Sequence, residues 1–182
     1  MSQQKSEIPI IVGDSIYLKE LTEADVDINY VNWMNDYDVV KFTESKNVIH
    51  TLTSIRTFVE NCTTSESDIL FGIFWKENDK HIGNIKLGSI NFIHKHADIG
   101  LIIGLKEYWG QHVASNAISL VTAYAFNNLD MHKVYAGIYA CNTGSKNAFV
   151  NAGYHLAYIK KEEVFFHNDW IDCIFMEKFN PK

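Results

Sequence analysis

The sequence predicts a single α/β domain built from a mixed sheet with helices on its faces. Its 182 residues suit one domain with a sizeable core, and 47% hydrophobic and 21% charged residues are ordinary values for a globular protein. Segments with the alternation or apolar runs of strands are interleaved with segments of helical spacing. No repeat or Pro/Gly/Ser-rich linker interrupts them, so one continuous domain over residues 11–180 is expected after a flexible polar tail of residues 1–10.

The N-terminal part of the chain predicts a strand, two helices and a second strand. Ser15–Leu21 alternates apolar and polar residues, as a strand does. Thr22–Asp36 opens with a Thr cap and acidic first-turn residues before apolar residues at helical spacing, which predicts a helix. A second helix is expected at Ser54–Asn61, and the apolar run Ile69–Glu77 predicts a strand that ends in a turn.

The middle of the chain predicts a hairpin followed by a long helix. His81–Ile93 and Ala97–Gly104 flank the sequence HKH, and the second of them is apolar on both faces, as in a central strand. The helix is expected from Gly110 to about Asn128. No charged side chain occurs from Gly110 to Leu129, although acidic residues are favoured in the first turn of a helix.

The C-terminal part predicts three strands and one short helix. Val134–Ala140 has the pattern of a buried strand, and Asn142–Tyr154 that of a short helix with an Asn N-cap and Gly153 as its C′ residue. Two strands near His155–Phe166 and Trp170–Phe179 complete the order β-α-α-β-β-β-α-β-α-β-β.

Composition argues against several classes of function. The net charge is −6, and the chain has one arginine, Arg56, and no block of basic residues, so nucleic acid is not an expected partner. No apolar run has the length of a membrane span, and the N-terminus lacks a signal-peptide pattern. Cys62, Cys141 and Cys173 are scattered without a CxxC pair, which favours a reducing, cytoplasmic setting and argues against a metal site.

The charge-free helix start at Gly110 is the first indication of a binding site. A strand, a glycine loop and a helix without acidic residues at its start can form a backbone cradle for phosphate, because free N–H groups and the helix dipole attract an anion. The loop matches neither the GxGxxG of dinucleotide folds nor the GxxxxGK[ST] of P-loops. A buried helix whose polar end faces water would give the same pattern, so spacing alone leaves both interpretations open.

Longer stretches of the sequence resemble a known family. ADIGLIIGLKEYWGQHVASNAI and CNTGSKNAFVNAGY are similar to the GNAT superfamily of acyl-CoA-dependent N-acetyltransferases, and most closely to its ribosomal-protein-alanine (Rim-type) branch. WMNDYDVVKFTES and HNDWID resemble the same branch, so the likeness extends from about Ile16 to Met176. It implies the GNAT fold, a mostly antiparallel mixed sheet of about six or seven strands, with helices on both faces and a splay in the middle. It also implies transfer of an acetyl group from acetyl-CoA to a primary amine by direct attack.

The resemblance assigns the coenzyme A site to this loop and to neighbouring strand ends. In the family, the loop that corresponds to Trp109–Ala114 holds the pyrophosphate, which implies binding here by N–H groups of about Gln111 to Ser115. The family's Asn after the fifth strand, which corresponds to Asn142, forms a hydrogen bond with the pantetheine arm. The implied coenzyme-binding residues are Ile102, Ile103, Gly104, Gly110, Gln111, His112, Val113, Ala114, Ser115, Asn142 and Lys146.

His112 replaces the central glycine of that loop in the family. Glycine permits close approach and unusual φ, but histidine keeps its backbone N–H and is among the residues enriched at positive φ. The ring is expected to lie outward or to donate to a phosphate. A histidine that obstructs the cradle would instead leave a non-catalytic or weakly active acyl-CoA-binding module, which is the alternative function.

The resemblance also implies the catalytic residues. In the Rim-type branch a serine at the NxxS spacing is proposed to protonate the departing thiolate, and here that residue is Ser145. Many other members use a tyrosine at the position of Phe149, which has no hydroxyl. For the base, Glu162 lies on a strand expected to flank the substrate site. The alternative bases are Glu163, His94, His96 and Asp98.

The acceptor side is expected beside the first two helices. Trp33, Tyr37 and Phe42 would shape its wall, with His94 as a further acceptor residue, although core packing is the alternative role of each aromatic side chain. GSINFIHKHADIG resembles the hairpin of acetyltransferases from surface-polysaccharide and nonulosonic-acid pathways. The acceptor is therefore either a protein N-terminus, which requires a groove open at both ends, or the amino group of a nucleotide-linked sugar, which requires basic or stacking residues. Acetyl-CoA and this amine are the expected partners of a monomer or homodimer.

Overall fold

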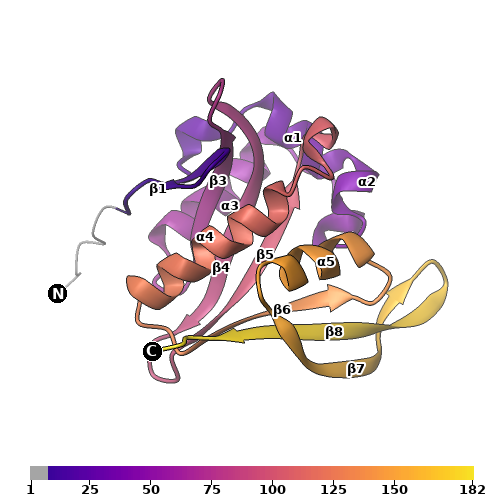
Figure 1. Ribbon diagram of the computed structural model, residues 1–182. Helices are drawn as coiled ribbons and strands as arrows, with labels where there is room; N and C mark the ends of the chain where they lie inside the picture. Colours follow the sequence, from indigo (N-terminus) through magenta and orange to yellow (C-terminus); the bar gives the residue numbers. More distant parts are fainter. Residues whose placement is uncertain (1–7) are drawn as a thin grey trace.

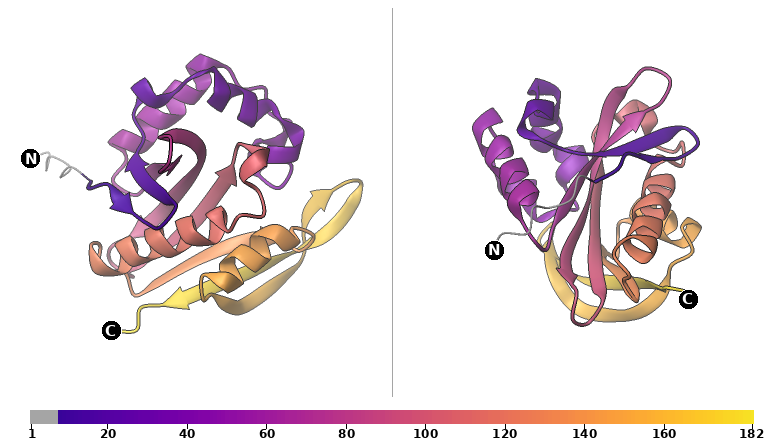
Figure 2. Two further views of the ribbon diagram at one scale, coloured as in Figure 1. Left: turned by 45° about the horizontal axis from the view of Figure 1, so that its top comes forward. Right: turned by 90° about the vertical axis from the view of Figure 1, so that its left-hand side faces the viewer.

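The computed structural model describes residues 8–182, which form one sheet with helices on both faces (Figure 1, Figure 2). Residues 1–7 of the expected N-terminal tail lie outside the described residues. The strands are β1 (Ile11–Val12), β2 (Ile16–Glu20), β3 (Ile69–Trp75), β4 (Lys80–Asn91), β5 (His96–Ile103), β6 (Lys133–Tyr139), β7 (His155–Phe166) and β8 (Asp169–Phe179). The helices are α1 (Ile28–Asn35), α2 (Tyr37–Val40), α3 (Leu52–Thr64), α4 (Val113–Asn127) and α5 (Thr143–Asn151). Within this described range, none of the helices combines the length and the hydropathy needed to cross a bilayer.

The strand order confirms the predicted fold class and adds one strand. The eight strands follow the order β1-β2-β3-β4-β5-β6-β8-β7, and each pair of neighbours is antiparallel except β5 and β6. The sequence predicts about six or seven strands. The additional strand is β1, whose two residues are too few to show an alternation.

The central strands β5 and β6 pair at one end only. Their parallel ladder joins His96–Asp98 to Lys133–Tyr135 and then stops. β5 continues to Ile103 against β4, and β6 continues to Tyr139 against β8, so the two strands diverge toward their carboxyl ends. This is the predicted splay. Both strands are fully described, and beyond the ladder their facing edges carry no strand partner.

The first predicted helix is interrupted. Thr22 caps only a short 3₁₀ helix, Glu23–Asp25, after which the chain becomes extended. α1 starts afresh after Asp27, whose side chain accepts a hydrogen bond from Tyr30 N at 3.0 Å. The prediction of one continuous helix over Thr22–Asp36 is wrong, because Asp27 is itself a strong N-cap and starts a new helix at this point.

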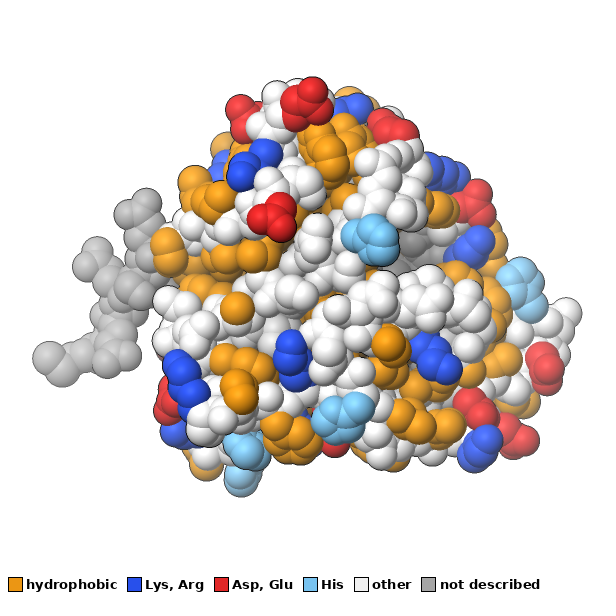
Figure 3. All heavy atoms as spheres, in the orientation of Figure 1, with side chains coloured by type: hydrophobic (Ala, Val, Ile, Leu, Met, Phe, Trp, Pro, Cys, Tyr) orange, Lys and Arg blue, Asp and Glu red, His pale blue; other side chains and the backbone are white. Residues whose placement is uncertain are grey.

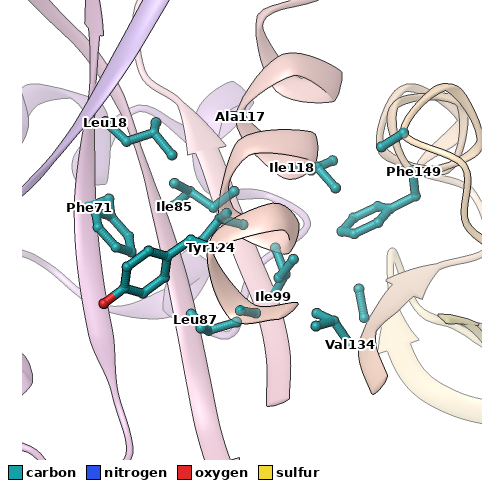
Figure 4. Close-up of a cluster of buried hydrophobic side chains, with 14 of the residues drawn as sticks. Leu18, Phe71, Ile85, Leu87, Ile99, Ala117, Ile118, Tyr124, Val134 and Phe149 are labelled. Atoms are coloured by element: carbon teal, nitrogen blue, oxygen red, sulfur yellow. The ribbon is translucent and has the colours of Figure 1, made fainter. Parts of the chain in front are cut away.

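α4 and the sheet enclose the main core. Figure 4 shows side chains of this core from α4, from strands β2 to β6 and from α5: Leu18, Phe71, Ile85, Leu87, Ile99, Ala117, Ile118, Tyr124, Val134 and Phe149. Burial explains why most of α4 lacks charge. It does not explain the first turn, where Ala114 and Asn116 are half-buried and could be acidic without entering the core.

The opposite face of the sheet is covered over only part of its width. α1 and α3 pack on β2 and β3 through a second core that includes Trp33, Val59 and Phe74, and Trp33 also contacts His81 of β4. On the same face, β5 and the strands beyond it expose residues such as Gly100 and Tyr158. The splay therefore separates two halves of the sheet: helices cover both faces of the first half, and α5 covers one face of the half beyond the splay.

Candidate active site

The loop before α4 leaves the N-terminus of this helix open. Gly110 and His112 both have left-handed backbones, with φ of 75° and 60°. His112 is the N-cap, so α4 begins at Val113 and not at Gly110 as predicted. The expectation that histidine can adopt the positive φ of the family glycine is confirmed, and its side chain is exposed. Its carbonyl accepts hydrogen bonds from Asn116 N (3.0 Å) and Ser115 Oγ (2.9 Å), which fixes the first turn.

Side chains of the loop hold the loop itself. Trp109 Nε1 donates to Ile103 O at 2.8 Å, and Gln111 Nε2 donates to Glu107 O at 2.6 Å. The first N–H groups of a helix have no acceptor inside it, and here the first turn has no acidic side chain to meet them. On this side of the molecule the Lys and Arg side chains are scattered rather than gathered (Figure 3). An anion at this point would therefore be held mainly by backbone N–H groups.

A pocket of about 510 Å³ joins the start of α4 to the splay. Its walls come from the end of β5, the loop and first turn of α4, the first turns of α5, and α2 with the residues after it. Eight of the predicted coenzyme residues line it: Ile102, Ile103, Gly110, His112, Val113, Ala114, Ser115 and Asn142. Predicted residues from the end of β5, the start of α4 and the start of α5 thus share one cavity, although they are separate in the sequence.

Three predicted coenzyme residues are outside the lining of this pocket. Gly104 is buried beneath Trp33, where an added Cβ would overlap the indole ring, so its role is close packing. Gln111 turns its side chain back to Glu107. Lys146 is exposed on α5, one turn after the N-cap.

Ser145 lies in the pocket wall at the start of α5. Asn142 is the N-cap of this helix, and its Oδ1 accepts a hydrogen bond from Ser145 N at 3.1 Å, as a helix cap should. Ser145 is half-buried, and within the described part of the chain its hydroxyl makes no hydrogen bond. Phe149 is buried against Tyr154 in the core, so the hydroxyl that this helix brings to the pocket wall is that of Ser145.

The three predicted acceptor-side aromatic residues separate into different environments. Phe42 lines the pocket and packs against Phe166, with ring centroids 5.5 Å apart. Tyr37 is exposed and shares a hydrogen bond of 3.2 Å with His167 Nε2. Trp33 is in the second core and does not line the pocket, so the alternative of core packing holds for this residue.

Two further predicted residues lie away from the pocket. Glu162 is exposed on the edge strand β7, where its φ is 52°, and its N–H donates to Asp172 Oδ1. His94 is in the turn at the amino end of β5, roughly 25 Å from the pocket end at about 3.3 Å per residue. Their positions do not support Glu162 as the base or His94 as an acceptor residue. The alternative bases are also outside the pocket lining: Glu163, His96 and Asp98.

The sequence analysis missed a polar cluster beside the acceptor end of the pocket. Tyr139, the last residue of β6, donates from its hydroxyl to Glu44 Oε1 at 2.8 Å and accepts from Lys46 Nζ at 2.9 Å. Phe42, which lines the pocket, packs edge-on against the Tyr139 ring. The end of a buried strand was the one signal that marked Tyr139, and nothing in the sequence linked it to Glu44, 95 residues away.

A splayed strand pair and an open helix N-terminus that share one pocket define a site for an acyl-CoA-dependent acyltransferase. Residues 15–155 match the family described as acetyltransferase (GNAT) domain, and the chain belongs to this family. It is 26% identical over 179 residues to a probable N-acetyltransferase, YjcK, of Bacillus subtilis (strain 168), covering 94% of this chain and 98% of YjcK. It is also 26% identical over 149 residues to YoaA, an uncharacterized N-acetyltransferase of the same organism, covering 80% of this chain and 82% of YoaA. The chain is an N-acetyltransferase that uses acetyl-CoA.

Solved structures show that the same fold serves different acceptors. Spermidine N-acetyltransferase from Vibrio cholerae, in complex with CoA and spermine, has a TM-score of 0.82 at 20% identity and covers 92% of this chain and 97% of its own. RimL, a ribosomal L7/L12 alpha-N-protein acetyltransferase in complex with coenzyme A, has a TM-score of 0.84 at 15% identity, over 94% of this chain and 98% of its own. The acceptor of the present chain has to be inferred from its own site.

Proposed function

We propose that this protein transfers the acetyl group of acetyl-CoA to the primary amine of a compact acceptor, such as the amino group of a nucleotide-linked sugar. The observation that carries the proposal is the single pocket in which the open start of α4, the splay and Ser145 meet. A coenzyme that lies through this pocket has its anionic part at the helix and its thioester between the strands.

The chain's own residues bind and orient the coenzyme. N–H groups of Val113 to Ser115 receive the pyrophosphate, because no acidic side chain competes for them. The free edge of β5 near Ile102 and Ile103 offers backbone groups to the pantetheine and to the thioester oxygen as it becomes anionic. Because Ile103 O already accepts a hydrogen bond from Trp109 Nε1, the backbone groups of β5 before this carbonyl are the ones available to the coenzyme.

Ser145 is proposed as the acid that protonates the departing thiolate. Its N–H is held by Asn142, which fixes the residue at the pocket wall, and its hydroxyl is not engaged by any described residue. Direct attack of the amine requires no covalent enzyme intermediate, so a hydroxyl that can donate one hydrogen bond is sufficient at this position.

The shape of the acceptor end favours a compact acceptor over a polypeptide that passes through. The segment from α2 to Phe42 contacts the tip of the β7–β8 hairpin through Tyr37 with His167 and Phe42 with Phe166. These contacts bridge the two halves of the molecule beside the pocket, so they would obstruct a through-running peptide, which requires a groove open at both ends. Lysines and stacking rings beside the opening suit an anionic, ring-containing carrier.

The test is the release of free thiol from acetyl-CoA in the presence of an alanyl-terminated peptide, a UDP-linked amino sugar and methylamine. Ser145→Ala should lower kcat by about 10- to 100-fold with little change in KM for acetyl-CoA, because the lost interaction is strongest in the transition state. Ser119→Ala, a change at an exposed serine of α4, is the matched control. A wild-type kcat in Ser145→Ala would assign the proton to water, and no thiol release with any amine would refute the proposed function.

A further inference from the structure

Glu44, Lys46 and Tyr139 form an ordered polar cluster behind Phe42, which lines the acceptor end of the pocket, although none of the three is itself part of the pocket lining. The cluster's two hydrogen bonds, 2.8 and 2.9 Å, connect the segment after α2 to the end of β6. Lys46 Nζ also stands over the rings of Tyr139 (4.7 Å) and Phe166 (5.6 Å). These contacts hold a carboxylate at a defined place although Glu44 itself is exposed to solvent.

The position of Tyr139 puts this carboxylate level with the part of β5 where the proposed function places the thioester. The β5–β6 ladder pairs Asp98 with Tyr135, and the same register carried into the splay sets Tyr139 opposite Ile102, which lines the pocket. Ile138 packs in the core with α4 and α5, so the Tyr139 side chain is on the other face of the sheet. The coenzyme approaches from the α4 face, and Glu44 stands on the face from which an acceptor would approach.

The direction of the hydrogen bonds leaves Glu44 ready to receive a proton. Burial, and secondly the hydrogen bond to Glu44, raise the pKa of Tyr139 well above its usual range, so its phenol stays protonated and acts as donor. Tyr139 thus uses one oxygen of Glu44, Oε1. Among the described residues the other oxygen has no hydrogen-bond partner, and it can accept from a ligand.

We propose that Glu44 binds the ammonium group of the acceptor and accepts its proton, and that Tyr139 is the positioning residue that holds Glu44 in place. This inference rests on the proposed function and names its base. It assigns to Glu44 the role for which Glu162 was the sequence candidate.

The proton balance is complete without a further reactant. The acceptor arrives as an ammonium ion and gives one proton to Glu44, which holds this proton during the attack and releases it to water afterwards, because its side chain is exposed. The neutral nitrogen then attacks the thioester carbon, the C–N bond forms and the C–S bond breaks. The nitrogen loses its second proton as the intermediate collapses, and this proton replaces the one that Ser145 gives to the sulfur. The net products are the amide, the free thiol of coenzyme A and one proton.

Charged and titratable groups around Glu44 come from several elements. Lys46 lies in the same short 3₁₀ helix as Glu44 (Glu44–Asn47), and Tyr139 lies on β6. The thiols of Cys141, just after β6, and Cys173, on β8, contribute to the raised pKa of Tyr139. On β7, Lys160 and Glu163 pair with each other at 3.0 Å, so their charges largely cancel. Lys46 is the cation next to the proposed ammonium site, and a fixed cation disfavours the protonated form of a neighbouring amine, which assists proton loss.

The experiment is the pH dependence of kcat/KM for methylamine, whose amine resembles a lysine side chain with a pKa of about 10. The wild type should bind the ammonium form, so kcat/KM should be nearly constant from about pH 6.5 to 8.5. Glu44→Gln must capture the rare neutral amine, so its kcat/KM should rise by about tenfold per pH unit and lie about 100-fold below wild type at pH 7. Tyr139→Phe should lower kcat/KM by about tenfold and keep the flat profile.

Two controls separate this role from a structural one. Glu60→Gln, at an exposed position of α3, should leave the profile unchanged, and the affinity of Glu44→Gln for coenzyme A by calorimetry should equal that of wild type. A flat profile in Glu44→Gln, or a loss of coenzyme binding in both cluster variants, would overturn the role of Glu44. If the wild type released no thiol with any of the three amines, the proposed function would fail and this inference with it.

Discussion

Two glycines on the same face of the sheet, one in β5 and one just after it, show that the two halves of the sheet differ in how far helices cover this face. Gly104, at the end of β5, lies under the Trp33 ring of α1, where an added Cβ would overlap the indole. At Gly100, four residues earlier, a Cβ would meet no atom within 4 Å. The half of the sheet from β1 to β4 is covered on both faces and supplies a rigid wall, whereas the strands beyond the splay leave one face open. The main core extends across both halves, so the difference between them is the face that the second half leaves uncovered.

The largest expected effect is at the start of α4, where the pocket wall meets the splay. Ala114→Glu places a carboxylate in the first turn of α4, on the pocket wall, where it repels the pyrophosphate and fills part of its space. Coenzyme A affinity should fall by about 100-fold or more, in line with about 3 kcal/mol of repulsion at close range. Calorimetry measures this loss. Ala123→Glu makes the same change at an exposed position of the same helix, and equal affinities for the two variants would contradict the assigned pyrophosphate site.

The free energies of unfolding of variants at Gly104 and Gly100 test this comparison directly. Gly104→Ala should lower the free energy of unfolding by about 1–3 kcal/mol, the usual cost of overpacking a core. Gly100→Ala should be neutral or stabilising by up to about 1 kcal/mol, because alanine loses less conformational entropy in a strand. Urea unfolding of both variants gives the two values. Equal destabilisation at both positions would show that the open face is covered in solution.

The smallest expected effect is at His112, where the loop departs from the family pattern. Its left-handed backbone and exposed side chain agree with the proposal that backbone N–H groups bind the pyrophosphate. His112→Gly should therefore leave coenzyme A affinity within about threefold at both pH 5.5 and pH 8, since glycine adopts the same φ freely. A loss of affinity confined to pH 5.5 would instead show that the protonated ring donates to a phosphate. A large gain at both pH values would show that histidine obstructs the cradle.

Local pattern was sufficient for most of the elements, and together with the family resemblance it predicts the loop and helix start that line one end of the pocket. Alternation and helical spacing predict seven of the strands, and the glycine loop before a charge-free helix start predicts the wall that Gly110 and Val113 form. These features depend on residues close together in the chain. The same local logic failed at Thr22–Asp36, where two caps compete within five residues and the second starts a new helix.

Short-range spacing in the sequence determined most strands, helix starts and loops, and the resemblance of longer stretches to the GNAT family implied an acetyl-CoA-dependent enzyme with a splayed sheet. The tertiary structure alone decided which side chains meet at the acceptor end. The order β6-β8-β7 brings the hairpin tip with Phe166 against Phe42, and the register of β6 brings Tyr139 to Glu44 across 95 residues. Glu162 and His94 have suitable side chains but lie on the edge strand and at the far end of β5. A sequence specifies the chemistry of each side chain, while only the packed sheet specifies which of them can reach the same atom.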